Sequence, residues 1–388
     1  KRDAVNVTLL LWMATGTIRL FFGGREHGFI AIRDYALVYY GAFFFLAQHV
    51  ARDPAAARFL QRSVLFACGA LMLVHPVYSQ FPDFFLGTFA IRGFPLIYFK
   101  DDLAGNFMAI GSLLFFMRFE ETRRNAWLVF SLVLAGLMLM TNSRSSMVGL
   151  AAGALWLGLS GRWRFACTLT AGGAVAALVL VFVAEVQGES WRQTPLLRVY
   201  ERVMSIADPL GQRAYETEDA FKGDNNVFRM VWWRAAIAET METDRWFGLG
   251  FGHDLAARFV RQYLPEATDD FTARSPHNVL ITIFARMGIV GFACFFAVLV
   301  ALALRTWRAL RVHDTTFTSG AWWCAAWVIL VCACFGVVLE GPMGAVVFWT
   351  ILGVANARMQ ERLETTSPPE ALIHTDPNLQ TAGSARGV

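Results

Sequence analysis

Long apolar stretches recur along most of the chain, and they constrain its fold more than any other feature. A helix needs about 20 mostly apolar residues to cross the hydrocarbon core of a bilayer. The sequence is 56% hydrophobic and only 16% charged, whereas soluble domains are about 25% charged. We therefore expect an all-α polytopic membrane protein. Ten stretches meet or approach the required length: 5–22, 29–50, 61–79, 104–119, 125–141, 145–160, 165–186, 277–304, 319–339 and 343–357.

Arginines mark alternate connections between these stretches. The segments 51–62, 118–124, 161–164 and 305–311 carry them, and so does the tail after residue 357. Because positive residues are retained on the cytoplasmic side, both termini are expected in the cytoplasm. The remaining connections then face outward: 23–28, 80–103, 142–144, 187–276 and 340–342.

One outward connection, 187–276, is far longer than the others. Three amphipathic stretches within it, 196–206, 224–243 and 253–264, predict helices, and a glycine-punctuated turn runs from Trp246 to Gly252. The chain is thus expected to comprise membrane helices in 1–186, an outward helical subdomain in 187–276, membrane helices in 277–357, and a disordered cytoplasmic tail in 358–388. The stretch 277–304 contains Gly288 and Gly291, and fits one tilted helix or a short helix followed by a spanning one.

The charged residues exclude some classes of protein. Lysine is almost absent, and the arginines are spread through short loops rather than gathered on one face, which does not indicate a nucleic-acid partner. The six cysteines all fall in apolar runs and form neither a disulfide framework nor a zinc-binding spacing.

Ionisable groups at the outward ends of membrane helices are the candidate functional residues. The predicted topology places six there: Arg33, Arg144, Arg229, Arg274, His277 and Glu340. A histidine is a workable general base near neutral pH, and an arginine at a helix N-terminus suits an anion. Five of them also have a plainer interpretation: His277 as an interfacial or capping residue, Arg144 and Arg229 as solvated or salt-bridged, Arg33 as a local partner of Asp34, and Glu340 as a solvated carboxylate. Arg286, further along the 277–304 helix, is expected to pair inside the bundle.

Three motifs together resemble the bacterial O-antigen ligase family. The first is His277-Asn278, nine residues, Gly288, two residues, and Gly291. The others are the turn 142–144, which is similar to one in the related O-antigen polymerases, and Arg229 with its following tryptophans and the Gly248–Gly252 turn. The resemblance covers roughly 125–300 and implies a GT-C-like fold with about 10–12 transmembrane helices.

The resemblance implies a glycosyltransferase of lipopolysaccharide biosynthesis in the bacterial inner membrane, with its active site facing the periplasm. Such a ligase transfers O-antigen polysaccharide from undecaprenyl pyrophosphate to a sugar hydroxyl of lipid A–core, with inversion and without metal or other cofactor. Its partners are then the lipid-linked donor, the lipid A–core acceptor and membrane lipids. Arginine is the natural substitute for a metal at a pyrophosphate because its planar guanidinium binds phosphate with two parallel hydrogen bonds.

The residue roles follow as a hypothesis. His277 is the general base or a pyrophosphate contact, and Arg144 and Arg229 bind the pyrophosphate. Arg33 is a third cation, Glu340 orients His277 or an arginine, and Asn278 contacts substrate. The rival functions are an O-antigen or capsule polymerase, a protein O-oligosaccharyltransferase, and, from another class, a transporter or flippase.

Overall fold

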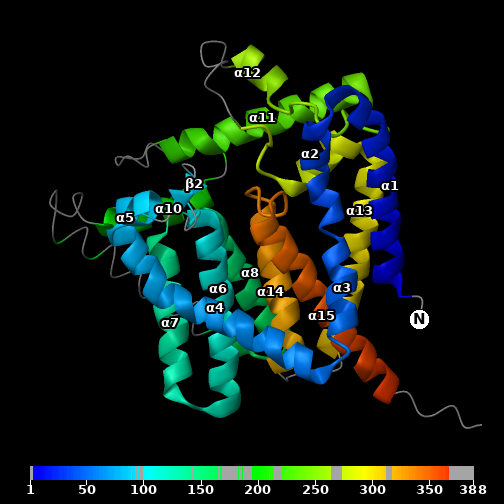
Figure 1. Ribbon diagram of the computed structural model, residues 1–388. Coiled ribbons are helices and arrows are strands. Elements are labelled where there is room, and N and C mark those ends of the chain that lie inside the picture. Colours follow the sequence, from blue (N-terminus) through cyan, green and yellow to red (C-terminus); the bar gives the residue numbers. More distant parts are fainter. Residues whose placement is uncertain are drawn as a thin grey trace, which may run out of the picture.

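The computed structural model describes residues 3–88, 90–91, 94–95, 99–141, 143–164, 167, 182, 186, 195–208, 210, 212, 221–263, 273–311 and 317–366. These residues form a helical bundle capped at one end by further helices (Figure 1). They show the all-α polytopic membrane protein that the sequence predicts. The only strands within the described residues are the two-residue β1 (Ala90–Ile91) and β2 (Phe94–Pro95), which pair antiparallel.

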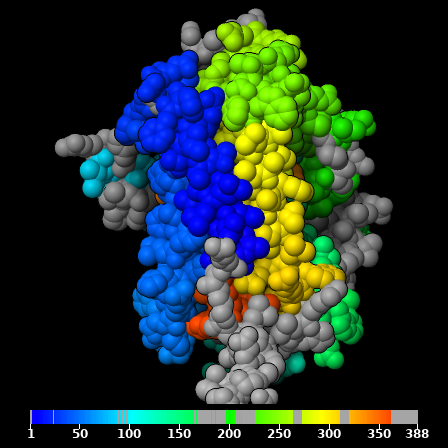
Figure 2. Space-filling model, turned by 90° about the vertical axis from the view of Figure 1, so that its right-hand side faces the viewer, coloured from blue at the N-terminus to red at the C-terminus, as the bar shows by residue number. Residues whose placement is uncertain are grey.

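The bundle is built from helices that are adjacent in sequence or brought together from distant segments. Helix α6 packs on α7 and α8, α14 packs on α8 and α15, α15 packs on α3, and α1 packs on α13. Figure 2 shows the last of these pairs, α1 in blue beside α13 in yellow, with the outer helices in green above them. The bundle helices are α1 (Ala4–His27), α2 (Phe29–Tyr39), α3 (Ala42–Val50), α4 (Pro54–Gln80), α6 (Asp101–Thr122), α7 (Asn125–Met140), α8 (Arg144–Leu159), α13 (Val279–Arg311), α14 (Phe317–Ala333) and α15 (Pro342–Thr366).

Four segments of the described residues are long and apolar enough to cross a membrane: Ala4–Gly23, Phe29–Val50, Pro54–Gln80 and Val279–Leu310. Asn125–Met140 and Gly320–Ala333 are shorter apolar helices. Many large apolar side chains of these helices are exposed, including Phe21, Phe66 and Leu73, which suits a surface solvated by lipid.

Two predicted elements differ from the structure in detail, and a third is not tested by it. The stretch 29–50 is divided into α2 and α3 by a turn at residues 40–41. The predicted span 165–186 lies outside the described residues apart from three helical positions. The tail was expected to be disordered from residue 358, and this is wrong for 358–366, because α15 continues to Thr366 with Met359 buried and Arg358 paired to Glu361 at 2.6 Å. Residues 367–388 are not described.

The connection 187–276, which is predicted to face outward, forms three helices in its described parts, as predicted. Helix α11 (Phe221–Thr243) lies across the end of the bundle, with α12 (Ala257–Tyr263) above it and α10 (Pro195–Ala207) to one side (Figure 1). A small apolar core that includes Trp232, Phe259 and Val260 joins α11 to α12. The short α5 (Pro82–Thr88) lies toward the same end.

Helix α13 is broken at Gly288, which has φ 63° and ψ −163°. The structure therefore selects the short helix followed by a spanning one. The glycine-punctuated turn fills the break: Leu249 N donates to Ala285 O at 2.7 Å, Gly250 N to Arg286 O at 3.1 Å, and Ile289 N to Arg245 O at 2.9 Å. A Cβ at Gly248 would lie 2.5 Å from the backbone nitrogen of Gly288, so only glycine fits at this contact.

Candidate active site

The predicted functional residues converge on one end of the bundle, beneath α11. They lie on α2, at the start of α8, on α11, just before α13, and in the connection 334–341 between α14 and α15. That connection is the orange loop below α11 in Figure 1. Residues more than 300 positions apart in sequence, such as Arg33 and Glu340, line one cavity.

His277 is held in an unusual backbone conformation. Its φ is 56°, in the left-handed region that non-glycine residues seldom adopt. Two tryptophans of α11 hold this turn from above: Trp233 Nε1 donates to the carbonyl oxygen of Pro276 at 2.6 Å, and the Trp232 ring meets the His277 ring edge-on with centroids 5.9 Å apart. The tryptophans that follow Arg229 in the sequence therefore fix the position of His277.

The surroundings of His277 favour the neutral imidazole. Burial lowers the pKa of His277, and the positive charges of Arg229 and Lys100 lower it further. Asp102 and a hydrogen bond from the ring N–H to the Ser275 backbone carbonyl oppose this shift.

Asn278 and Glu340 hold the segment around His277. Asn278 caps α13, its Oδ1 accepting from Leu280 N at 3.0 Å and Ile281 N at 3.3 Å. Glu340 accepts from the hydroxyls of Ser275 and, at 3.1 Å, Thr282, which lie on either side of His277. Burial raises the pKa of Glu340. Glu340 thus supports the chain that carries His277, whereas a substrate contact by Asn278 stays a prediction, with its Oδ1 already engaged in the cap.

Arg144 and Arg229 line one pocket of about 340 Å³, which we call the arginine pocket. Helix α8 begins at Arg144, as the turn predicted. The hydroxyl of Ser143 caps this helix by accepting from Ser146 N at 3.3 Å, and Asn142 of the turn lies outside the described residues. Arg144 Nη1 donates to Asn226 Oδ1 at 2.9 Å, and Arg229 Nη1 donates to Phe335 O at 3.0 Å. The other walls are largely apolar, with Val148, Ile206, Met230, Trp233 and Phe335.

Arg229 is partly desolvated. Burial lowers its pKa, and the nearby carboxylate of Asp102 opposes the shift. An arginine remains charged at neutral pH even so, because its ordinary pKa is above 12. The arginine pocket therefore combines apolar walls with two guanidinium groups.

His277 lines a different pocket of about 280 Å³, which we call the polar pocket. Its charged lining consists of Arg33, Asp34, Arg274, His277, Arg286 and Glu340. Arg33 pairs with Asp34 at 3.0 Å and does not line the pocket of Arg144 and Arg229. A role for Arg33 at a substrate stays a prediction. The residues that the sequence assigned to one site are thus divided between two pockets, each lined in part by the connection 334–341.

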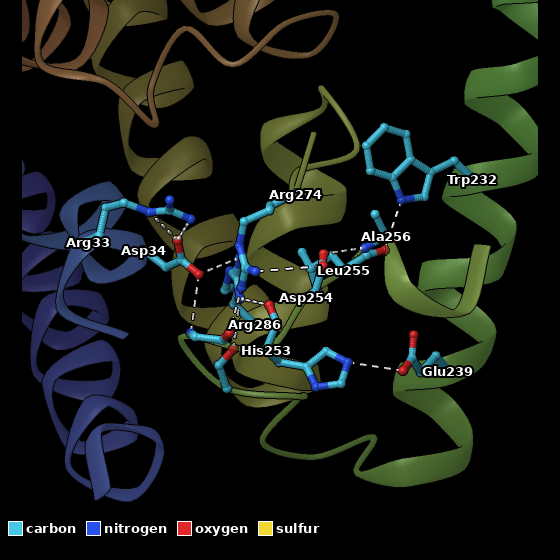
Figure 3. A network of polar contacts seen from close by, with 12 residues as sticks. Arg33, Asp34, Trp232, Glu239, His253, Asp254, Leu255, Ala256, Arg274 and Arg286 are labelled. Carbon is cyan, nitrogen blue, oxygen red and sulfur yellow. Dashed lines mark hydrogen bonds and ion pairs between the residues drawn. The ribbon is translucent and has the colours of Figure 1, made fainter. Parts of the chain in front are cut away.

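A network of hydrogen bonds and ion pairs extends from the polar pocket through Asp34 and Arg286, which both line it (Figure 3). Arg286 pairs with Asp34 at 2.8 Å, which confirms the prediction that it pairs inside the bundle. Arg286 Nη1 also donates to the carbonyl oxygens of Gly250 and His253, and Asp34 accepts from Gly252 N at 3.2 Å. Helix α2, helix α13 and the glycine-punctuated turn are locked together by these contacts.

Two charged residues that the sequence analysis did not single out belong to this region. Lys100 and Asp102, at the start of α6, line a third pocket of about 300 Å³ together with Leu103, Val338, Met343 and Glu340. Asp102 Oδ2 also lies beside the 334–341 connection, 3.8 Å from where a Cβ on Gly336 would stand. The sequence offered one indication that Lys100 is unusual, because it is one of only three lysines in the chain.

Within the described residues, no three His, Cys, Asp or Glu side chains gather as a metal site requires. The charged groups that do gather are mostly arginines, around one histidine. Such a set can bind an anion, stabilise a negatively charged leaving group and take up a proton.

Comparison with known proteins identifies a family for the central part of the chain. Residues 129–296 match the model of the O-antigen ligase family. This part of the chain is similar to the O-antigen ligases. The matched segment contains Arg144, Arg229 and His277, and it runs from α7 past the break in α13. Among curated proteins, no sequence matches the chain.

The domain match supports a ligase-type or polymerase-type role in O-antigen biosynthesis, carried out by a multi-pass membrane protein. Arg33, Lys100, Asp102 and Glu340 lie outside the matched segment. The structure nevertheless brings them to the same end of the bundle as the domain's own charged residues.

Proposed function

We propose that the protein is an O-antigen ligase, which transfers polysaccharide from undecaprenyl pyrophosphate to a sugar hydroxyl of lipid A–core at the periplasmic face of the inner membrane. The observation that carries the proposal is the division of charged residues between two adjacent pockets. One pocket holds the candidate base, His277, and the other holds two arginines in apolar surroundings.

The arginine pocket suits a lipid pyrophosphate. Its apolar walls match an isoprenoid chain, and Arg144 and Arg229 can pair with phosphate oxygens through two parallel hydrogen bonds each. Negative charge grows on the pyrophosphate as the glycosidic bond breaks. Fixed guanidinium groups in a partly desolvated site stabilise that charge in the transition state, without metal in the mechanism we propose.

The polar pocket suits the acceptor. The acceptor hydroxyl loses its proton as its oxygen attacks the anomeric carbon, and a neutral His277 can take that proton. Burial and the two nearby cations lower the pKa of His277, which keeps the ring unprotonated at neutral pH. Glu340, through Ser275 and Thr282, orients the segment that carries this base.

An arrangement with base and leaving group in separate pockets favours inversion. In a single displacement, the attacking oxygen and the departing pyrophosphate lie on opposite sides of the anomeric carbon. The anomeric centre would then sit between the two pockets, close to the connection 334–341. Retention through a covalent sugar intermediate would instead need an enzyme nucleophile on the face opposite the pyrophosphate, with the acceptor then entering from the side that the pyrophosphate has left.

The test is transfer by purified protein in detergent, with lipid-linked polysaccharide as donor and lipid A–core as acceptor. His277→Ala is expected to lower kcat by about 100-fold or more, since general base catalysis contributes about 10²–10⁴. The matched control is His49→Ala, on α3 at the opposite end of the bundle from α11. Full activity of a folded His277→Ala protein would refute the assignment of the base.

The same assay tests the remaining parts of the proposal. Transfer is expected to persist in EDTA, and a loss restored by Mg²⁺ or Mn²⁺ would contradict the use of arginines in place of metal. Activity in detergent, where no gradient exists, separates an enzyme from a transporter. A polymerase would extend the glycan on the lipid carrier and leave lipid A–core unmodified, and a protein O-oligosaccharyltransferase would modify a polypeptide instead.

A further inference from the structure

Two arginines of the polar pocket have no part in the proposed displacement. Arg33 and Arg274 line the pocket that contains His277, and neither lines the arginine pocket. Figure 3 shows them on either side of Asp34, one from α2 and the other from the segment just before α13. Their guanidinium groups need an explanation beyond the leaving group.

The two side chains retain unused hydrogen-bonding capacity. Arg274 Nη2 donates to Gly252 O at 2.7 Å, and Nη1 lies 3.6 Å from Asp254 Oδ2. Its Nε is buried and has no hydrogen-bond partner within the described part of the chain. Arg33 donates to Asp34 Oδ1 through Nε and Nη2, and its side chain is 56% exposed. A buried donor without a partner is costly, and a ligand acceptor would remove that cost.

The pocket also has an excess of positive charge. Three guanidinium groups line it, those of Arg33, Arg274 and Arg286, against the carboxyl groups of Asp34 and Glu340. Asp34 is already engaged by Arg286, Arg33 and the amide of Gly252. Asp254, which lies 3.6 Å from Arg274 Nη1, does not line the pocket. An anionic group on the ligand would balance the remaining charge.

The size of the pocket limits the ligand. Its volume is about 280 Å³, just below the ~300–1,000 Å³ that binds drug-sized molecules. A sugar with one charged substituent is of this scale, whereas a long glycan is not. The candidate base, His277, lines the same pocket as Arg33 and Arg274. The attacked hydroxyl and the anionic group would therefore belong to neighbouring positions of one acceptor.

We propose, building on the ligase function above, that the polar pocket selects an anionic acceptor: Arg274, with Arg33, binds a phosphate or carboxylate carried by the acceptor glycan next to the attacked hydroxyl. The guanidinium fork binds either group with two parallel hydrogen bonds, which places the hydroxyl beside His277. The arginines of the polar pocket thus determine acceptor specificity, and those of the arginine pocket bind the donor.

The experiment compares acceptors in the purified transfer assay. One acceptor is intact lipid A–core, a second is treated with phosphatase, and a third has its carboxyl groups reduced to alcohols. For the wild type, removal of the recognised group is expected to raise the acceptor KM by about 10- to 100-fold, as for a lost charge-assisted hydrogen-bonded pair. An effect of phosphatase treatment identifies phosphate as the recognised group, and an effect of carboxyl reduction identifies carboxylate.

The variants test the residues. Arg274→Gln is expected to raise the acceptor KM by a similar factor and to leave the donor KM unchanged, and Arg274→Lys should recover part of the loss. On the acceptor that lacks the recognised group, Arg274→Gln should add little, because the interaction is already absent. Arg33→Gln should show a smaller effect of the same kind, and Arg261→Gln, an exposed arginine on α12, should show none.

Three results would overturn the inference. Wild-type transfer that is indifferent to both acceptor treatments excludes an anion-reading pocket without any variant having to fold. Equal losses of Arg274→Gln on all acceptors would show that Arg274 only holds Gly252 and Asp254 in place. A rise in the donor KM would move Arg274 to the donor side. Absence of wild-type transfer to every lipid A–core acceptor would instead refute the ligase function itself.

Discussion

The tryptophan that holds the His277 turn offers a direct test of how the site is built. Trp233→Phe removes the indole N–H that donates to the carbonyl oxygen of Pro276 at 2.6 Å. The phenyl ring keeps an aromatic, apolar wall in the arginine pocket, which Trp233 also lines. The substitution therefore removes one hydrogen bond, with little change to the surface that would meet the donor lipid.

The size of the expected effect follows from two free energies: the backbone strain at His277, which favours a relaxed turn, and the hydrogen bond from Trp233, which opposes it. His277, with φ 56°, sits in a conformation that costs a non-glycine residue about 1–2 kcal/mol. Pro276 is buried, so loss of the hydrogen bond leaves its carbonyl group unsatisfied at a cost of about 1–3 kcal/mol. The two costs are similar, so a relaxed turn becomes competitive with the native one. A change of about 1.4 kcal/mol corresponds to a factor of ten.

We expect kcat for transfer to fall about tenfold, with the donor KM nearly unchanged. The assay is in vitro transfer at saturating donor and acceptor, with thermal unfolding of each variant measured alongside. The control is Trp246→Phe, since Trp246 is a 52%-exposed tryptophan of the same outer region. If Trp233→Phe behaves like the control, or alters the donor KM alone, the positioning role of Trp233 is refuted.

Two further predictions concern the charges near the site. The acid limb of kcat/KM should lie below pH ~6.5, because burial, Arg229 and Lys100 lower the pKa of His277. Lys100→Met removes a positive charge and should move the acid limb to higher pH. Asp102→Asn removes a negative charge and should move it to lower pH. Shifts of both variants in the same direction would contradict the assignment of the limb to His277. Asp34→Asn leaves Arg286 buried without its ion-pair partner, which costs about 3–5 kcal/mol when a buried pair is broken. Thermal unfolding should show a large loss of stability. The double variant with Arg286→Met should recover only part of it, because it also loses the hydrogen bonds from Arg286 to the carbonyl oxygens of Gly250 and His253. An unchanged melting temperature of Asp34→Asn would show that the pair is dispensable.

The local features of the site were predictable because they depend on neighbours in sequence. Ser143 caps α8 and Asn278 caps α13 because both side chains reach the backbone N–H groups that follow them. The three helices of the outward connection were visible in their apolar periodicity. Helix limits were less secure: α15 extends beyond the last apolar residues because an ion pair between Arg358 and Glu361 and the burial of Met359 continue it.

The groups that surround His277 were not predictable in the same way. Trp233 precedes Pro276 by more than 40 residues, and Lys100 and Asp102 come from a separate helix. Nothing in the periodicity of α6 relates its first turn to a histidine far along the chain. The charge environment of His277 could therefore be obtained only after the helices had been placed.

The sequence by itself determined the class of the protein and the end of the bundle where chemistry is expected. Hydrophobicity sums along a segment, and arginines act on topology through the loops that carry them, so neither property needs a structure. Tertiary structure decided the partners: Asp34 for Arg286, the turn 245–252 for the break at Gly288, and separate pockets for His277 and the arginine pair. These pairings depend on which helix ends meet in space, and packing between segments distant in sequence determines which ends meet.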